Sequence, residues 1–189
     1  MVSGETSCFV QHDIGFQGCS YKRGGERRIG PMLSENQNTW KHEGNTISNF
    51  LATDPLSYDR ITDELTIGNW SAAMAIKTLN PLNIAVINSA DELEGAGAEF
   101  DIIVPHGAVS VERLNKNADA INAIQLCGRQ LFINCAQGME RSVLNGVWWL
   151  HRHRGVTVNE AQELVQSKRA VATNRLHWIG RDVPPSGLV

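Results

Sequence analysis

Short apolar runs alternate with longer amphipathic segments from Tyr58 to about Gly180. This alternation constrains the fold more than any other feature, because a strand that returns through a helix to the next strand lies parallel to it. The sequence therefore predicts an α/β domain with a mainly parallel central sheet flanked by helices. The expected strands are 61–67, 84–88, 100–104 and 131–134. The expected helices are 71–79, 111–128, a segment around Val143, Val147 and Leu150 that ends near Gly155, a segment after Thr157, and 174–180.

Polar residues mark the starts of two of these helices. Ser110 is a candidate N-cap, because its hydroxyl can accept a hydrogen bond from an amide of the first helical turn. Thr157 is followed by Glu160 at the third helical position, which is the pattern of a capping box.

The chain divides into three parts by its apolar pattern. Residues 1–57 hold no helical or alternating apolar period for more than one turn, so we expect an N-terminal extension that is largely disordered or irregular. Residues 58–182 form the expected α/β domain, and residues 183–189 form a C-terminal tail.

The overall charge argues against two classes of partner. The 189 residues include 17 Lys and Arg against 20 Asp and Glu, for a net charge of −3, whereas nucleic-acid backbones are bound chiefly by Lys and Arg. No apolar run approaches the roughly 20 residues that span a bilayer, and no secretory signal core is visible. We expect a cytoplasmic protein that binds neither nucleic acid nor membrane.

The cysteines predict thiol chemistry and no metal site. Cys8, Cys19, Cys127 and Cys135 are too few and too unevenly spaced for a disulfide framework. Cys8, His12 and Cys19 match no standard zinc spacing. We therefore expect no metal and no cofactor. Cys127 is expected to be buried on the long helix, although a turn after it leaves an approach to Cys135 conceivable.

Cys135 follows a buried strand and precedes a helix, at the end of the sheet where α/β proteins bind ligands. We call residues 135–141 the cysteine loop. The positive end of the following helix, together with Arg141, should lower the pKa of the Cys135 thiol and make it nucleophilic. Ser142 can donate a hydrogen bond to the thiolate.

The backbone of the cysteine loop can form an anion cradle. Its amides would point inward, Gly138 would supply the tight bend, and the planar fork of Arg141 would hold two phosphate oxygens. The expected phosphate-binding residues are Ala136, Gln137, Gly138, Met139, Glu140 and Arg141.

At these residues the chain resembles the cysteine-dependent protein tyrosine phosphatase superfamily, and in particular its small dual-specificity branch. The resemblance runs from about Tyr58 to Arg181 and includes four segments in the family's order: 61–69, 82–88, the loop at 134–142, and 155–161 with the basic pair Lys168 and Arg169. It implies that Cys135 is the nucleophile that takes the phosphoryl group, that Arg141 binds this group, and that Ser142 promotes hydrolysis of the thiophosphate.

The sequence departs from the family pattern at two positions. The family has His immediately before the nucleophile, whereas this chain has Asn134, which we expect to support the loop through hydrogen bonds. The family's general-acid Asp is absent, and His106 occupies the likeliest matching position; an imidazolium is a competent acid near neutral pH. Asp101 and Glu112 are the alternative carboxylates. Without the Asp we expect a weakened activity.

The rim of the loop favours a protein substrate. No additional Lys or Arg flanks it, as a polyphosphate ligand would require, and Glu140 is expected to point to solvent. We therefore expect a phosphatase that hydrolyses phosphotyrosine, phosphoserine or phosphothreonine of proteins through a phosphocysteine intermediate. The alternative is a pseudophosphatase that binds phosphorylated protein without turnover. A rhodanese-like sulfurtransferase or an arsenate reductase is disfavoured, because the loop follows three predicted strands.

Two further expectations concern the helix after the loop. Trp148 and Trp149 are adjacent, so one of them is expected to be partly exposed. The basic run His151 to Arg154 is expected to complement the negative end of that helix.

Overall fold

A computed structural model describes residues 55–79 and 83–180. Of the extension 1–57 that is expected to be largely disordered or irregular, residues 1–54 lie outside the described residues, as do the segment with Cys8, His12 and Cys19 and the expected C-terminal tail. The domain limits at 58 and 182 stay a prediction. Within the described ranges, no helix is long and apolar enough to cross a membrane.

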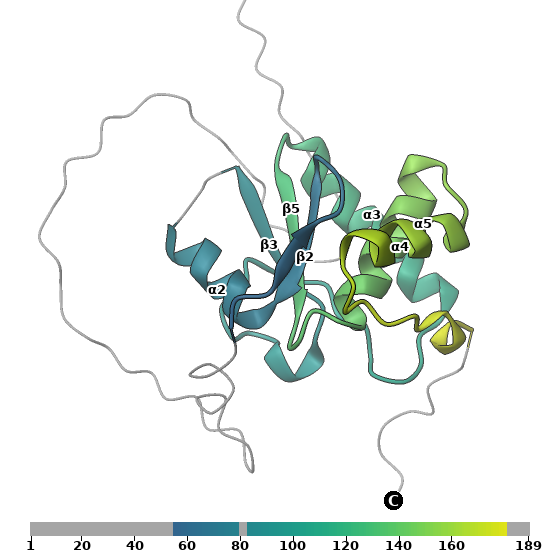
Figure 1. The fold of residues 1–189 in the computed structure, drawn as a ribbon, viewed down its shortest axis with the longest axis horizontal. Coiled ribbons are helices and arrows are strands. Elements are labelled where there is room, and N and C mark those ends of the chain that lie inside the picture. Colours follow the sequence, from purple (N-terminus) through teal and green to yellow (C-terminus); the bar gives the residue numbers. More distant parts are fainter. Residues whose placement is uncertain (1–54, 80–82, 181–189) are drawn as a thin grey trace, which may run out of the picture. The chain divides into compact units, whose positions relative to one another are not determined.

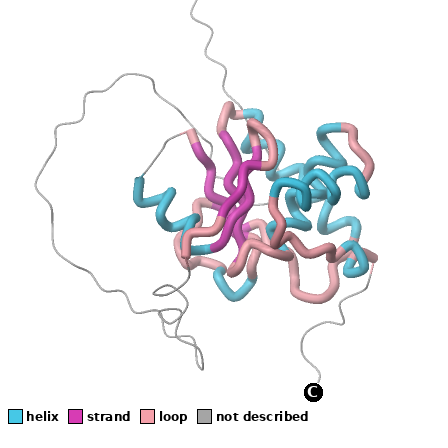
Figure 2. The backbone as a smooth tube through the Cα atoms, viewed as in Figure 1, coloured by secondary structure: helices cyan, strands magenta, loops and turns pink. Residues whose placement is uncertain are grey.

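A central sheet of five strands organises the described residues (Figures 1 and 2). Its spatial order is β1-β2-β5-β3-β4, and β1 pairs with β2 antiparallel while the other neighbours are parallel. The predicted mainly parallel α/β fold is confirmed. The strands are β1 (Tyr58–Arg60), β2 (Leu65–Asn69), β3 (Ile84–Asn88), β4 (Phe100–Asp101) and β5 (Gln130–Cys135).

Helices cover both faces of the sheet. Figure 1 shows α2 on one side and α3, α4 and α5 together on the other. Their bounds are α2 (Trp70–Leu79), α3 (Val111–Leu126), α4 (Arg141–Arg154) and α5 (Val158–Lys168), and short 3₁₀ turns lie at η1 (Asp91–Leu93) and η2 (Leu176–Trp178).

Two predicted strands are shorter than expected. The segment 61–67 is not one strand, because Ile61 N donates to Leu65 O at 2.9 Å and closes a turn between β1 and β2. β4 comprises two residues only, and the chain then leaves the sheet through the segment that carries His106.

Both predicted caps are present. The Ser110 hydroxyl accepts a hydrogen bond from Arg113 N at 3.1 Å at the start of α3. At the start of α5, Thr157 Oγ1 accepts from Glu160 N and Thr157 N donates to the Glu160 carboxylate, which completes the capping box.

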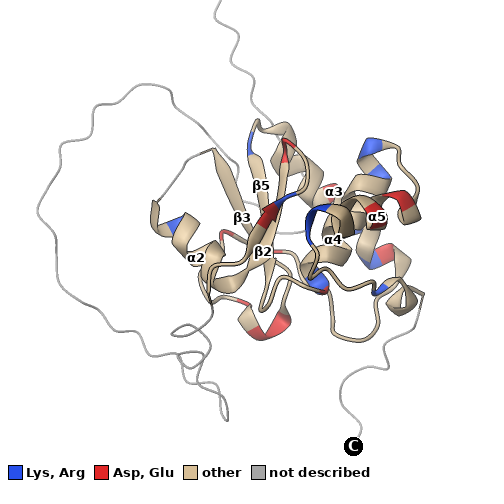
Figure 3. Cartoon of the chain, in the orientation of Figure 1, with Lys and Arg blue, Asp and Glu red and all other residues tan. Residues whose placement is uncertain are grey.

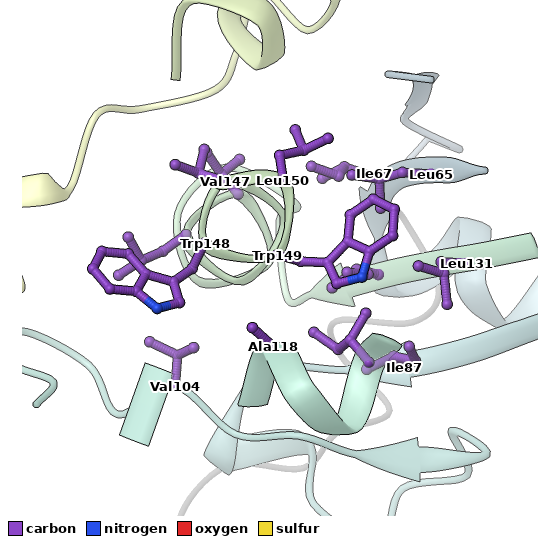
Figure 4. Close-up of a cluster of buried hydrophobic side chains, with 14 of the residues drawn as sticks. Leu65, Ile67, Ile87, Val104, Ala118, Leu131, Val147, Trp148, Trp149 and Leu150 are labelled. Carbon is purple, nitrogen blue, oxygen red and sulfur yellow. The ribbon is translucent and has the colours of Figure 1, made fainter. Parts of the chain in front are cut away.

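The expectation that Trp148 or Trp149 is partly exposed is wrong. Their exposed fractions are 8% and 0%. Figure 4 shows the two indoles leaving α4 in different directions, Trp149 toward the sheet residues Leu131 and Ile87 and Trp148 toward Val104. Two adjacent tryptophans can both be buried because α4 is covered by the sheet on one side and by helices and loops on others, so it has no wide solvent face.

The expectation for Cys127 is also wrong. Cys127 is exposed at the end of α3, where its thiol donates to Ala123 O at 3.4 Å. Cys135 is buried at the far end of β5. The strand between them spans roughly 17 Å at about 3.3 Å per residue, which is too long for a disulfide bond.

The basic run at the end of α4 is engaged in ion pairs within the domain. Arg152 and His153 contact the carboxylate of Asp119 at 2.7 and 3.0 Å, and Arg154 contacts Glu64 at 2.8 Å. These pairs give the run a structural role in joining α4 to α3 and to the turn before β2.

Candidate active site

The cysteine loop joins the buried strand β5 to the helix α4. The parallel pairing of β5 with β2 places Cys135 opposite Asn69, at the carboxyl edge of the sheet. Ala136 O accepts a hydrogen bond from Trp70 N at 3.1 Å, and Met139 O accepts one from Thr173 N at 2.8 Å. Gln137 is exposed. The loop backbone is therefore held at both ends by neighbouring segments.

Gly138 has a backbone conformation and a packing that only glycine satisfies. Its φ is +69°, in the left-handed region. A Cβ at this position would lie 2.4 Å from the carbonyl carbon and oxygen of Gly68. The tight bend predicted at Gly138 is therefore reinforced by close contact with β2.

The surroundings of the Cys135 thiol favour its thiolate form over an exposed thiol. Its residue is 3% exposed, and its Sγ lies 3.3 Å from Ser142 Oγ. Burial raises the pKa of the thiol, but hydrogen bonds from the Ser142 hydroxyl and from the backbone of Ser142 and Glu140, with the charge of Arg141, outweigh it. The net effect lowers the pKa of Cys135 below its ordinary value.

Arg141 is held by two carboxylates of η1. Its Nη1 donates to Asp91 Oδ1 at 2.9 Å, and its Nη1 and Nη2 both donate to the carboxylate of Glu92. Burial lowers the pKa of Arg141, but the hydrogen bond and charge of Glu92 raise it above its ordinary value. Sequence reasoning missed both acidic residues, since they lie about fifty positions before the arginine.

The hydrogen-bond count on Arg141 leaves one edge of its guanidinium available. Of its five N–H groups, two of Nη1 and one of Nη2 go to Asp91 and Glu92. Nε is buried and has no partner among the described residues. Nε–H and the second N–H of Nη2 together form a two-donor fork, which matches two oxygens of a phosphoryl group.

Arg169 supports the cysteine loop through its bend at Gly138. The sequence did not predict this contact. Arg169 is fully buried, its Nε donates to Gly138 O at 2.7 Å, and its two Nη atoms contact Asp59 at 2.7 Å and Ser57 Oγ at 3.1 Å. The available signal in the sequence was its position in the basic pair Lys168–Arg169 at the end of α5. The residue ties the loop bend to β1 and the segment before it.

His106 lies beside Glu140 of the cysteine loop. His106 Nε2 is 3.7 Å from Glu140 Oε2, and its ring packs on Trp178 with centroids 5.0 Å apart. Glu140 Oε1 also accepts from Arg175 Nε at 2.9 Å. The expectation that Glu140 points to solvent is therefore wrong, because Arg175 holds its carboxylate against the domain.

The two alternative acids are engaged elsewhere. Asp101 accepts hydrogen bonds from Asn88 Nδ2 at 2.8 Å and from Gly95 N at 3.0 Å. Glu112 pairs with Lys116 at 2.9 Å along the exposed face of α3. Neither carboxylate has a hydrogen bond to the cysteine loop.

Asn134 differs from the expectation that its side chain supports the loop. The residue is fully buried, and both polar atoms of its amide lack hydrogen-bond partners among the described residues. Its backbone carbonyl accepts from Ser89 N at 2.7 Å. The backbone of Asn134 thus contributes to pairing within the central strand β5, whereas its side chain makes no hydrogen bond to the loop.

A buried network of amide side chains joins α4 to the segment after β4. Asn145 Nδ2 donates to Ser89 Oγ at 2.9 Å and to Ile102 O at 2.8 Å. Asn117 Nδ2 donates to Asn145 Oδ1 at 3.0 Å and to Ile103 O at 3.1 Å. These bonds fix the chain that leads to His106 relative to the helix that begins at Arg141.

No group of three or more His, Cys, Asp or Glu side chains is arranged to hold a metal ion in the parts of the chain that the structure describes. The groups assembled here are instead a thiol, a guanidinium and backbone amides, which suit an anion.

Comparison with known proteins agrees with the resemblance to phosphatases found in the sequence. A dual specificity protein phosphatase 1-B of Xenopus laevis is 30% identical over 67 residues, which are 35% of this chain and 18% of the relative. The match therefore spans about a fifth of that protein's length. No family model matches the chain.

Two solved structures share the fold. Human DUSP28 superposes with a TM-score of 0.56 at 24% identity, covering 66% of this chain and 89% of that one. A mouse putative dual specificity phosphatase complexed with zinc tungstate gives a TM-score of 0.56 at 26% identity, covering 66% and 83%. Together with the position of the cysteine loop between β5 and α4, these likenesses indicate a phosphatase-like α/β domain. In fold and in part of its sequence, the chain is similar to the cysteine-dependent protein tyrosine phosphatases, and the proteins it resembles here are dual specificity phosphatases.

Proposed function

We propose that the protein hydrolyses phosphomonoesters of phosphorylated proteins, on tyrosine, serine or threonine, through a phosphocysteine intermediate. One observation carries the proposal: the two ends of the cysteine loop hold a thiol with a lowered pKa, Cys135, and an arginine with an unpartnered buried Nε, Arg141. The first supplies a nucleophile and the second supplies a site for the phosphoryl oxygens. The mouse phosphatase of the same fold is complexed with zinc tungstate, and tungstate is an oxyanion, which is consistent with this assignment.

In the first step, the Cys135 thiolate attacks phosphorus and the bond to the substrate oxygen breaks. The two-donor fork of Arg141 holds equatorial oxygens while charge develops on them. His106, as imidazolium, gives its proton to the departing oxygen. The products of this step are the free hydroxyl of the substrate and the phosphocysteine.

In the second step, water attacks phosphorus and the bond to Sγ breaks. Neutral His106 takes the proton of the water and returns to its starting state. The Ser142 hydroxyl, 3.3 Å from Sγ, donates a hydrogen bond to the departing thiolate. Inorganic phosphate then leaves the loop.

The role of His106 rests on its place beside the cysteine loop. It sits 3.7 Å from the carboxylate of Glu140, the residue immediately before Arg141. The ring contact with Trp178 restricts its orientation. Asp101 and Glu112 are held in other hydrogen bonds and ion pairs, which favours His106 over either of them.

Hydrolysis of an aryl phosphate between about pH 5 and pH 8 tests the proposal. An aryl leaving group needs little protonation, so the nucleophile is tested even with a weak acid. We expect Cys135→Ser to reduce the rate to background and Arg141→Ala to reduce kcat by about 10²-fold or more. Vanadate should inhibit the wild type. Full activity of Cys135→Ser would exclude the mechanism.

The effect of His106→Ala should depend on the leaving group. We expect little change with the aryl phosphate and a loss of about 10² or more with an alkyl phosphate, the range typical of a general acid. Equal losses on both esters would assign His106 a role other than proton transfer.

A second candidate function is phosphoprotein binding without turnover. It is favoured by the buried amide of Asn134, which makes no hydrogen bond to the loop, where the family has His. This alternative expects phosphopeptide binding that requires Arg141, together with no vanadate-sensitive hydrolysis.

A further inference from the structure

The segment that contacts Arg141 is strongly acidic. Residues 91–101 contain five carboxylates and no Lys or Arg. Asp91 and Glu92 contact the guanidinium from η1, and their side chains remain 56% and 47% exposed. Figure 3 shows this turn as a red patch below the sheet. The outer faces of both carboxylates are therefore open to a bound molecule.

The other side of the loop does not balance this charge. Glu140 adds a third carboxylate, and Arg175 is paired with it. Arg141 is thus one cation shared between Asp91 and Glu92. A phosphoryl group bound to its remaining fork would place two further negative charges on the opposite edge of the same guanidinium.

This arrangement has a consequence for substrate choice. Like charges at this separation repel, and the repulsion weakens binding of the phosphoryl group unless a cation lies near. The residues of η1 include no Lys or Arg. Farther along the same segment, Lys77 contacts Gly97 O and Arg129 pairs with Glu99, so neither is paired with Asp91 or Glu92. A positively charged side chain of the substrate would therefore supply compensating charge at η1. A Lys or Arg beside the phosphorylated residue can reach the exposed faces of Asp91 and Glu92.

We propose that the site selects phosphorylated residues flanked by Lys or Arg and rejects polyanionic phosphate esters. The proposal rests on the phosphatase function proposed above and specifies its substrate class. Two observations carry it: the half-exposed carboxylates on one edge of Arg141, and the buried unpartnered Nε on the other.

Matched phosphotyrosine peptides test this preference with the full chain. Three peptides of equal length carry Arg, Ala or Glu on both sides of the phosphotyrosine, and kcat/KM is measured for each alongside an aryl phosphate. Half-exposed ion pairs change affinity by about two- to fivefold each. We expect kcat/KM to fall in the order Arg, Ala, Glu by that factor per step, and the spread to shrink at high salt.

Charge-removing variants locate the source of the preference. Asp91→Asn and Glu94→Gln each remove one charge near η1, where Glu94 ends the turn. Each should reduce the ratio of kcat/KM for the Arg peptide to kcat/KM for the aryl phosphate. The control is Glu163→Gln, which removes one charge from the exposed face of α5 and should leave the ratio unchanged.

The outcomes separate this proposal from the function it rests on. Equal rates for the three peptides, or a faster Glu peptide, with normal aryl phosphate hydrolysis would overturn the substrate preference and leave the phosphatase function intact. If no phosphate ester is hydrolysed, binding of the same peptides to the wild-type chain decides whether the site prefers flanking Lys or Arg. Tighter binding of the Arg peptide supports the preference, and absence of binding overturns it together with the function.

Discussion

Gly138 is the residue whose replacement the structure tolerates least in the cysteine loop. Gly138→Ala would place a Cβ 2.4 Å from the Gly68 carbonyl at φ +69°. We expect a loss of more than about 1 kcal/mol in unfolding free energy and at least a tenfold loss of activity. Urea unfolding and aryl phosphate hydrolysis measure the two effects.

Gly155→Ala is the matched control for this prediction. Gly155 has φ +72°, but a Cβ there would meet nothing within 4 Å. It should cost about 1 kcal/mol of stability and leave the activity of the folded protein unchanged. Similar activity losses in both variants would show that the contact with Gly68 is unimportant.

Ser142 is expected to act on the Cys135 thiol directly. Its hydrogen bond stabilises the thiolate, so Ser142→Ala should raise the pKa of Cys135. The rate of alkylation by iodoacetamide, followed against pH, should show its midpoint at higher pH than in wild type. An unchanged midpoint would mean that the backbone amides and Arg141 set the pKa alone.

The contacts of Arg169 could not be predicted from the sequence. The cysteine, arginine and serine of the loop are adjacent in sequence, and their chemistry is predictable from spacing. Arg169 acts through atoms 31 positions away at Gly138 and 110 positions away at Asp59. Asp91 and Glu92 meet Arg141 in the same way. Contacts at such separations leave no local pattern.

At the scale of elements, Arg169 joins β1 to the cysteine loop. Arg169→Met would remove three hydrogen bonds and leave Gly138 O without its partner. Asp59 is 43% exposed and stays solvated, so the main cost is the buried Gly138 carbonyl left without a hydrogen bond, typically about 1–3 kcal/mol. We expect a loss of that order in urea unfolding, with lower kcat. Lys168→Met, at an exposed neighbouring position, should change neither value.

The burial of both tryptophans makes α4 the central packing element. Trp148→Ala and Trp149→Ala should each reduce the unfolding free energy by about 3 kcal/mol or more, as large core truncations do. Leu126→Ala, at a position 69% exposed, should cost less than about 0.5 kcal/mol. A small effect at Trp148 would restore the sequence expectation of a partly exposed face.

The elements themselves were largely predictable, and the failures have physical causes. Apolar periodicity predicted β3, β5 and the main helices, and polar residues at the helix starts predicted both caps. These features depend on side chains that are close in sequence. The predicted strand 61–67 covered the turn and the start of β2, and β1 was not predicted, since the apolar alternation begins at Ile61 in the turn. Helical spacing predicted one buried face for α4, whereas the surrounding layers bury nearly all of it.

At the scale of the whole molecule, the ion pair between Glu92 and Arg141 links stability to pH. Burial raises the pKa of Glu92, but the hydrogen bonds that Arg141 donates and the positive charge of its guanidinium lower it below its ordinary value of 4.5. A carboxyl with a depressed pKa in the folded state stabilises the fold above its unfolded pKa, and this contribution disappears as pH falls through the folded value.

Glu92→Gln should therefore be less stable than wild type at pH 7, by about 1 kcal/mol or less for a half-exposed group. The difference should be constant above pH 5 and vanish as the pH falls below 4.5. Urea unfolding of both proteins at a series of pH values measures it. A difference that persists at the lowest pH would assign the effect to packing.

The three hydrogen bonds of Arg169 also bear on when the site forms during folding. They connect the first strand of the described domain, the bend of the cysteine loop and the residue after the last long helix. Contacts so distant in sequence are entropically costly to close, so they form late. A partly synthesised or partly folded chain would carry the thiol without the organised cradle. Catalytic activity would then report that both ends of the domain have docked.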